Sequence, residues 1–221
     1  MKATAELSDI YRARFEASGL EKRRSVWKTL NDAFFSRLIS PEDEVLELAC
    51  GYGEFISTIP ARRKFGVDLN PDAARHLPAD VAFHHGSADD LSFLPAESVD
   101  VVFTSNFFEH LPDKAALSKV LAEGRRVLRP GGRFIALGPN IRFAYREYWD
   151  FYDHHLPLSD RSLAEALRAA MFRIDRAIPQ FLPFTMAGKT PAAPWMIRAY
   201  LAAPPVWKLL GKQFLMVARR T

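Results

Sequence analysis

Two glycines and two acids stand close together in ELACGYGEF, the segment from Glu47 to Phe55. Gly51 and Gly53 would let the backbone turn tightly and approach a ligand, because a Cβ atom at either position would collide with it. A helix predicted from Glu54 to Ile59 would point its first N–H groups at an anionic group such as a carboxylate. The segment therefore predicts a loop that holds one end of a small ligand.

Polar side chains also follow three later apolar segments. Asp68 ends GVDL, and its carboxylate can accept hydrogen bonds from both hydroxyls of a ribose. The residues after VAFHHG could meet an adenine edge, and Asn106, after VDVVFTS, would lie beside the reacting centre. We predict that the residues at these positions bind one cofactor: Glu47, Ala49, Gly51, Gly53, Asp68, Leu69, Ser87, Ala88, Asp89 and Asn106.

The order of these groups identifies the cofactor. A carboxylate, a ribose and an adenine in that order, without a pyrophosphate, describe S-adenosylmethionine. The alternative is a nicotinamide dinucleotide, whose fingerprint is G-x-G-x-x-G, but the third glycine position here is Ile56. We therefore predict S-adenosylmethionine. Cys50, inside the loop, has no candidate activating base nearby, so we expect it to pack rather than to react.

The elements that must position these residues alternate between strands and helices. Apolar strands are predicted at 44–48, 64–69, 81–86, 99–105 and 132–138, with a helix at 113–128 before the turn RPGG. This alternation implies a parallel sheet covered on both faces, a doubly wound Rossmann-like α/β fold. In such a sheet a ligand binds outside the carboxyl ends of the strands, where the predicted binding residues fall.

The two ends of the chain differ from this central part. Residues 4–38 are predicted to be helical with a break at Gly19, and a later helix begins at Ser159 or Asp160. Two more strands are predicted, at 172–178 and 213–220. We predict a single domain, 1–221, with these parts: a helical cover at 1–38, a cofactor-binding core at 40–178 and 212–221, and a cap insertion at 179–211.

Four segments together resemble a known family. VLELACGYGEF, GVDLN, VDVVFTSNFFEHL and RVLRPGGRF are similar to the cofactor loop, ribose-binding acid, fourth-strand motif and helix–turn–strand junction of class I S-adenosylmethionine-dependent methyltransferases. The resemblance covers residues 40–178 and the final strand. It implies a seven-stranded sheet of order 3-2-1-4-5-7-6 with an antiparallel last strand. Ala49 and Cys50 replace glycines of the pattern, and Ser87 stands where an aspartate is common.

Two neighbouring histidines are the candidate general base. If a hydroxyl accepts the methyl group, His155, or else His154, has a pKa suited to taking its proton at neutral pH. Asp153 or Tyr152 could orient His155. The alternative is that one histidine packs and the other bonds a loop carbonyl.

An aromatic and basic segment precedes the histidines and predicts a wall of the acceptor site. Arginines there would suit a phosphate or carboxylate on the acceptor, although solvated surface charges are an equal alternative. The predicted acceptor-binding residues are Arg142, Tyr145, Arg146, Tyr148 and Trp149.

A divalent metal site is the less favoured interpretation of EHL. Glu109 and His110, with His154 or His155, could supply oxygen and nitrogen ligands. We instead predict that His110 caps the following helix, and that no metal is bound.

Composition limits the function classes. The 221-residue chain has a net charge of +4, too small to argue for nucleic acid, and its single cysteine is typical of a reducing cytoplasm. We expect neither a signal peptide nor a membrane span. Aromatic and basic side chains interleave in the predicted cap and suggest contact with the inner face of a membrane: Trp195, Arg198, Tyr200, Trp207, Lys208 and Lys212.

The acceptor is less defined than the cofactor. SNFFE lacks the Pro-Pro-aromatic sequence of amide-nitrogen methylases, and PQFLPFT and WKLLGKQFLMVAR resemble methyltransferases of glycan and lipid-linked sugar assembly. We therefore predict a small-molecule or glycan-type acceptor, methylated on oxygen, and no nucleic acid. The alternatives are a catalytically silent cofactor-binding module that acts through partners, and an RNA or protein methyltransferase. The sequence leaves the oligomeric state open.

Overall fold

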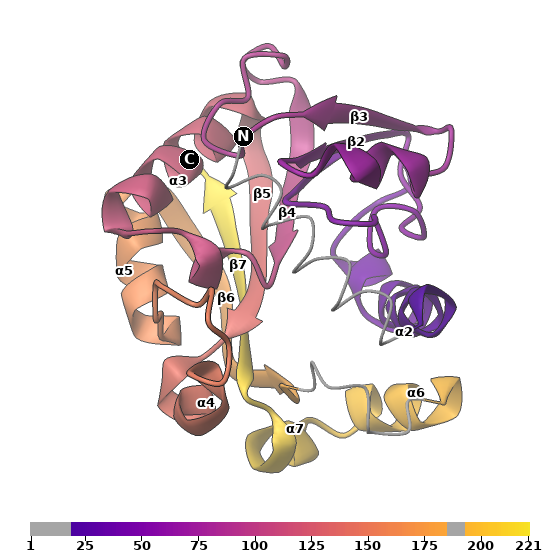
Figure 1. Cartoon of the computed structure of the whole chain (residues 1–221), viewed down its shortest axis with the longest axis vertical. Helices are drawn as coiled ribbons and strands as arrows, with labels where there is room; N and C mark the ends of the chain where they lie inside the picture. The colour runs from indigo at the N-terminus through magenta and orange to yellow at the C-terminus, as the bar shows by residue number, and fades with distance from the viewer. Residues whose placement is uncertain (1–18, 185–192) are drawn as a thin grey trace.

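A seven-stranded sheet in the order β3-β2-β1-β4-β5-β7-β6 forms the centre of the computed structural model, which describes residues 19–184 and 193–221 (Figure 1). The first five strands pair in parallel, and β7 is antiparallel to both of its neighbours. This confirms the predicted fold class, strand order and antiparallel last strand. The strands are β1 (Glu44–Leu48), β2 (Arg63–Asp68), β3 (Val81–His85), β4 (Val99–Ser105), β5 (Leu128–Pro139), β6 (Phe172–Leu182) and β7 (Gln213–Arg220).

Two strands, β5 and β6, extend several residues beyond their predicted bounds. The RPGG segment lies inside β5 as a bulge, because Val99 pairs with Leu128 but Val101 pairs with Arg133. Gly131 has φ +80° there, a left-handed conformation that glycine adopts without a steric penalty. β6 continues to Leu182, past the predicted end at 178, because it keeps a ladder with β7 after a second register shift.

Helices α3 (Lys114–Val127) and α5 (Asp160–Ala169) cover one face of the sheet (Figure 1). The buried face of α3 consists of Leu117, Val120, Leu121, Gly124 and Val127. The N-cap of α5 is Ser159, whose hydroxyl accepts the Ser162 N–H in a reciprocal capping box. Of the two predicted starts, Ser159 is therefore the cap.

The opposite face is covered by α2 (Leu20–Ala33) and η1 (Phe35–Arg37), which come from the N-terminal part of the chain. Phe55 stacks on Phe103 with ring centroids 3.5 Å apart, and the Trp27 ring meets both edge-on. The predicted helix from Glu54 to Ile59 is wrong, since this segment is a series of turns. The connection from β1 to β2 is short and contains Pro60, and α2 packs against it, with the Asn31 side-chain amide donating to the Phe55 carbonyl at 3.0 Å. The predicted helix at 4–18 lies outside the described residues.

Three short helices gather near the end of the sheet where β5 finishes: α4 (Ile141–Tyr148), α6 (Pro194–Ala202) and α7 (Pro204–Leu210) (Figure 1). The buried Asn140 side chain ties this end together, because its Nδ2 donates to Asp160 Oδ1 at 2.8 Å and to the Pro179 carbonyl at 2.9 Å. None of the described helices combines the length and the apolar character needed to span a bilayer.

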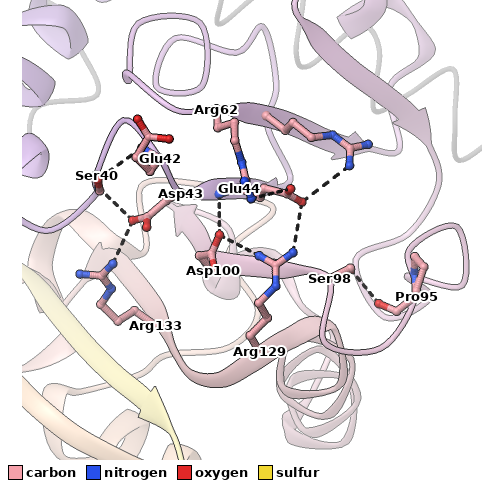
Figure 2. Close-up of polar contacts among 11 residues, drawn as sticks. Ser40, Glu42, Asp43, Glu44, Arg62, Pro95, Ser98, Asp100, Arg129 and Arg133 are labelled. Carbon is pink, nitrogen blue, oxygen red and sulfur yellow. Dashed lines mark hydrogen bonds and ion pairs between the residues drawn. The ribbon is translucent and has the colours of Figure 1, made fainter.

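Ion pairs hold the opposite, amino end of the parallel strands (Figure 2). Arg62 lies 2.9 Å from Glu44, and Asp100 accepts the Glu44 N–H at 2.8 Å and pairs with Arg129 at 2.8 Å. Arg133 bonds Asp43 at 2.9 Å. These contacts connect the starts of β1, β2, β4 and β5.

Candidate functional site

The loop after β1 has an unusual backbone. Ala49, Gly51 and Gly53 all have positive φ, at 50°, 54° and 70°. L-residues rarely adopt this conformation, so the two glycines relieve strain that any side chain would add. A Cβ atom at Gly53 would also lie 2.0 Å from Leu77 Cδ2. The predicted tight turn is present, and it brings bare backbone to the carboxyl edge of the sheet.

Asp68 ties this loop to the end of β2. Its carboxylate accepts the Gly51 N–H at 2.7 Å and the Asn70 N–H at 2.8 Å, and the residue is 4% exposed. A carboxylate can accept about four hydrogen bonds, so about two positions remain for ligand hydroxyls. Burial raises the pKa of Asp68 above its ordinary value, and the N–H bonds from Asn70 and Gly51 oppose that shift.

Glu47 and Glu54 add two more carboxylates beside the loop. Glu47 accepts the Ile56 N–H at 3.1 Å, and Glu54 pairs with Arg23 of α2 at 2.7 Å. Burial raises the pKa of Glu47 well above its ordinary value, and the charges of Glu54 and Asp68 raise it further. A cationic ligand would favour the ionised form of this cluster. These carboxylate acceptors therefore fit a molecule with ammonium or sulfonium charge and ribose hydroxyls, as S-adenosylmethionine has.

The ends of β3 and β4 complete this edge. Asp68 pairs with His85 in the ladder, and the Gly86 N–H donates to the Asp68 carbonyl at 3.0 Å. In the following turn Ser87 donates its hydroxyl proton to Asp89, while Ala88 is buried. Leu69 is half exposed, with its carbonyl 3.0 Å from His85 Nε2. The sheet thus brings the segments predicted to bind a cofactor to one edge.

Asn106 stands at the end of β4 in a left-handed conformation, with φ 48°. Its N–H donates to the Leu137 carbonyl at 2.9 Å, and its Oδ1 is buried without a hydrogen-bond partner among the described residues. Such a residue stores strain and has an unsatisfied acceptor, a combination typical of binding sites. A donor on the cofactor, such as its amino group, would satisfy Oδ1.

The two candidate bases point in different directions. The His155 side chain is exposed, and its backbone N–H donates to the Glu109 carbonyl at 2.7 Å. His154 is buried, with its ring stacked on Phe151 at 4.7 Å and 5.1 Å from the His110 ring. His154, the second choice from the sequence, therefore lies inside the protein beside other titratable groups.

The predicted cap role of His110 is wrong. The N-cap of α3 is Asp113, whose carboxylate accepts the Ala116 N–H at 2.8 Å. His110 Nδ1 instead lies 3.0 Å from the Asp153 carbonyl oxygen and 3.2 Å from Asp153 Oδ2. Burial lowers the pKa of His110, but the Asp153 and Glu109 carboxylates outweigh burial and leave it raised.

The predicted acceptor wall is divided between two faces of α4. Tyr148 is fully buried, with its ring 4.6 Å from the His154 ring. Tyr145 and Trp149 are more than half exposed, and Arg146 Nε donates to the Tyr145 hydroxyl at 3.0 Å on the surface. Arg142 pairs with Asp160 at 2.9 Å, which ties α4 to α5. Of the residues predicted to form the acceptor wall, Tyr148 therefore packs beside the buried His154.

The sequence did not indicate two contacts that shape the loop. Arg23 reaches Glu54 from α2, and Tyr52 stacks on His76 with centroids 3.9 Å apart. Arg24 fixes this second contact by donating to the His76 carbonyl at 2.5 Å. Each contact joins segments that are distant in the chain, and no local pattern marks them.

Comparison with known proteins agrees with this geometry. Residues 46–136 match the model of a methyltransferase domain. The chain is 35% identical to a Mycolicibacterium smegmatis protein described as a probable S-adenosylmethionine-dependent methyltransferase, over 62% of this chain and 55% of that protein. It is 30% identical to a fatty-acid O-methyltransferase of the same organism, over 71% of this chain and 57% of that protein. The chain thus spans about half the length of these curated relatives.

A solved structure has the same fold. The S-adenosylmethionine-dependent methyltransferase of Archaeoglobus fulgidus superposes with a TM-score of 0.64 at 20% identity, over 87% of this chain and 94% of that one. The sheet order, the strand-end site and these matches define a class I S-adenosylmethionine-dependent methyltransferase. Residues 46–136 therefore form a methyltransferase domain of this class, and S-adenosylmethionine is the cofactor that these matches imply.

Proposed function

We propose that this protein transfers a methyl group from S-adenosylmethionine to an oxygen of a small molecule with an apolar part, such as a lipid or a lipid-linked sugar. The observation that carries the proposal is the buried Asp68 carboxylate, which anchors the left-handed glycine loop and keeps acceptor positions for a ribose. The acidic cluster around Glu47 supports a cationic cofactor at the same edge.

The chain's own residues would mainly bind and position. Asp68 would accept the ribose hydroxyls, and the backbone of Gly51 and Gly53 would allow the amino-acid end of the cofactor to lie close. S-adenosylmethionine supplies a methyl group that is already electrophilic, because it is attached to a sulfonium. Holding the acceptor oxygen in line with it supplies most of the acceleration.

An oxygen acceptor must also lose its proton. The titratable groups that the fold gathers after β4 and α4 are Glu109, His110 and His154. His155 remains a candidate base from the sequence, but its exposed side chain favours the buried His154 cluster as the place where the hydroxyl binds.

The surface of the proposed cap, 179–211, supports an acceptor with an apolar part. Trp195, Leu209 and Leu210 are more than half exposed on α6 and α7. Exposed aromatic and aliphatic side chains beside basic ones suit the interface of an anionic membrane, where apolar acceptors collect. The likeness to a fatty-acid O-methyltransferase favours the same class of acceptor.

A groove of about 580 Å³ lies beside this surface, between α2, β6, α6 and α7. Its basic lining consists of Arg37, Arg176 and Arg198, and Phe34 and Trp207 add apolar walls. Arg198 also lies 3.8 Å from Asp32. This mixture would suit a molecule that joins an anionic group to an apolar chain.

The test is a screen for formation of S-adenosylhomocysteine by the purified protein. Fatty acids, quinols, glycolipids and free sugars are offered in turn, and the methylated product is identified by mass spectrometry. We expect turnover with an apolar hydroxyl or carboxyl acceptor, none in Asp68→Ala, and full turnover in the control Asp72→Asn. Turnover only with RNA or protein would refute the proposed acceptor class. Binding of S-adenosylmethionine without turnover of any acceptor would favour the silent module.

A further inference from the structure

Three side chains of metal-ligating type meet where β4 and α4 end. Glu109 and His110 lie in η3 (Phe108–His110), directly after β4, and His154 lies in the loop between α4 and α5. One ligand atom from each residue lies within 4.8 Å of the other two. Glu109 and His154 are buried, and His110 is partly buried. We propose that these three side chains bind a divalent transition-metal ion.

The hydrogen bonds of His110 set the tautomer that a metal needs. Both groups near its Nδ1, the Asp153 carbonyl at 3.0 Å and Asp153 Oδ2 at 3.2 Å, are acceptors. We therefore assign the proton to Nδ1, which leaves the lone pair of Nε2 available. Metal-binding histidines almost always donate their other N–H to a carbonyl or carboxylate in this way.

The backbone holds the two halves of the cluster together. The Glu109 carbonyl accepts the His155 N–H at 2.7 Å and the Leu156 N–H at 3.1 Å. The loop that carries His154 is thus fixed directly against η3. The ligands come from segments distant in the chain, but they need little rearrangement to surround an ion.

Tyr148 gives a second, independent indication of a ligand. Its side chain is fully buried beside His154, and its hydroxyl has no hydrogen-bond partner among the described residues. A buried hydroxyl without a hydrogen-bond partner is unfavourable. Water or an acceptor oxygen bound to the metal would satisfy it.

The donor set selects the kind of ion. Two imidazole nitrogens and one carboxylate suit Zn²⁺, Fe²⁺ or Mn²⁺, whereas Mg²⁺ prefers oxygen ligands throughout. Three protein ligands leave coordination positions open, as in catalytic rather than structural zinc sites.

The role of the ion rests on the proposed methyl transfer. A hydroxyl that coordinates the ion would have a lowered pKa and release its proton to water at neutral pH. The resulting oxygen would form the new C–O bond as the C–S bond of the sulfonium breaks, which would yield S-adenosylhomocysteine and the methyl ether.

Metal binding can be tested apart from activity. Chelator-treated full-length protein is titrated with Zn²⁺ and with Mg²⁺ by calorimetry, and the bound metal is counted by mass spectrometry. We expect a single Zn²⁺ site and much weaker Mg²⁺ binding. Asp153→Asn should weaken Zn²⁺ binding about 10–100-fold, and Glu109→Gln and His154→Asn at least as much. The matched control is His155→Asn, which changes the exposed neighbouring histidine and should leave Zn²⁺ affinity as in the wild type.

The proposal is overturned if wild-type protein binds no Zn²⁺, or if the ligand variants bind it as tightly as the wild type. If a ligand variant does not fold, X-ray absorption of Zn²⁺-loaded wild-type protein decides, since imidazole nitrogens should appear at about 2.0–2.1 Å. An absorption spectrum without imidazole nitrogen ligands to Zn²⁺ would also overturn the proposal. Binding of S-adenosylhomocysteine is measured in parallel, so that a failure of the cofactor site is distinguished from a failure of the metal site.

Discussion

Replacing Asp68 tests the part of the site on which cofactor binding depends. In Asp68→Asn the amide oxygen can accept only one of the two N–H groups that the carboxylate accepts, from Gly51 and Asn70. The amide nitrogen then faces the other donor, and one buried N–H loses its partner, at a cost of about 1–3 kcal/mol. Removing a buried charge with a raised pKa offsets part of this cost. We therefore expect a modest loss of stability.

The effect on the cofactor should be larger. A hydrogen bond to a charged acceptor contributes about 1.5–3 kcal/mol. Losing one ribose bond in Asp68→Asn would raise the Kd about 10–150-fold, and losing both in Asp68→Ala would raise it by more than about 100-fold. The loss of stability and the loss of cofactor affinity both arise from the Asp68 side chain, but only the loss of affinity requires a bound ligand.

The assay is titration calorimetry with S-adenosylhomocysteine, together with urea unfolding of the same samples. Asp72→Asn is the matched control, because Asp72 pairs on the surface with Arg75 at 3.0 Å and its backbone N–H still bonds Asn70. An Asp68→Asn protein that is folded and has the wild-type Kd would refute the assignment of this edge as the ribose site.

Three further predictions concern the scaffold. In Gly124→Ala the new Cβ would lie 2.5 Å from Phe134 Cε2, so the urea midpoint should fall by the equivalent of about 1–3 kcal/mol; an unchanged midpoint would contradict the packing. Phe103→Ala empties the stack on Phe55 and should cost about 3–5 kcal/mol of unfolding free energy in the same assay, and a cost near that of a surface change would argue against this core. The raised pKa of Glu47 means that the folded, ligand-free protein holds a proton that the unfolded chain loses near pH 4.5, so stability should decrease as pH rises above that value. Glu47→Gln should remove this slope from urea-unfolding curves measured across pH, and an unchanged slope would assign it to another group.

Strand positions and cofactor motifs could be predicted because they depend on local pattern. Each parallel strand is a short run of apolar residues, and a buried parallel strand has to be apolar on both faces. The carboxyl ends of such strands lie at one edge, so Asp68 and Asn106 could be placed together from their positions in the chain. The buried stripe of α3 followed in the same way from its helical period.

The acceptor side could not be predicted in this way. Two pairs of residues at a spacing of four on α4 and its C-cap each include an aromatic ring, Ala144 with Tyr148 and Tyr145 with Trp149, and only the first pair is buried. Either pair satisfies the helical period, and contact with the rest of the protein decides which one faces inward. The sequence also could not decide which of His154 and His155 faces inward. The side chains of adjacent loop residues point apart, and the hydrogen bonds from the loop backbone to the Glu109 carbonyl fix which one is buried.

The sequence by itself determined the strands, their order through the family pattern, and the acids and glycines at the strand ends, because these depend on short-range periodicity and composition. The tertiary structure alone decided that α2 packs against the segment after the glycine loop, and that His154 rather than His155 joins Glu109 and His110 beside Tyr148. These arrangements join segments far apart in the chain. Their free energy comes from packing and hydrogen bonds that exist only after the sheet has formed, so no local pattern indicates them.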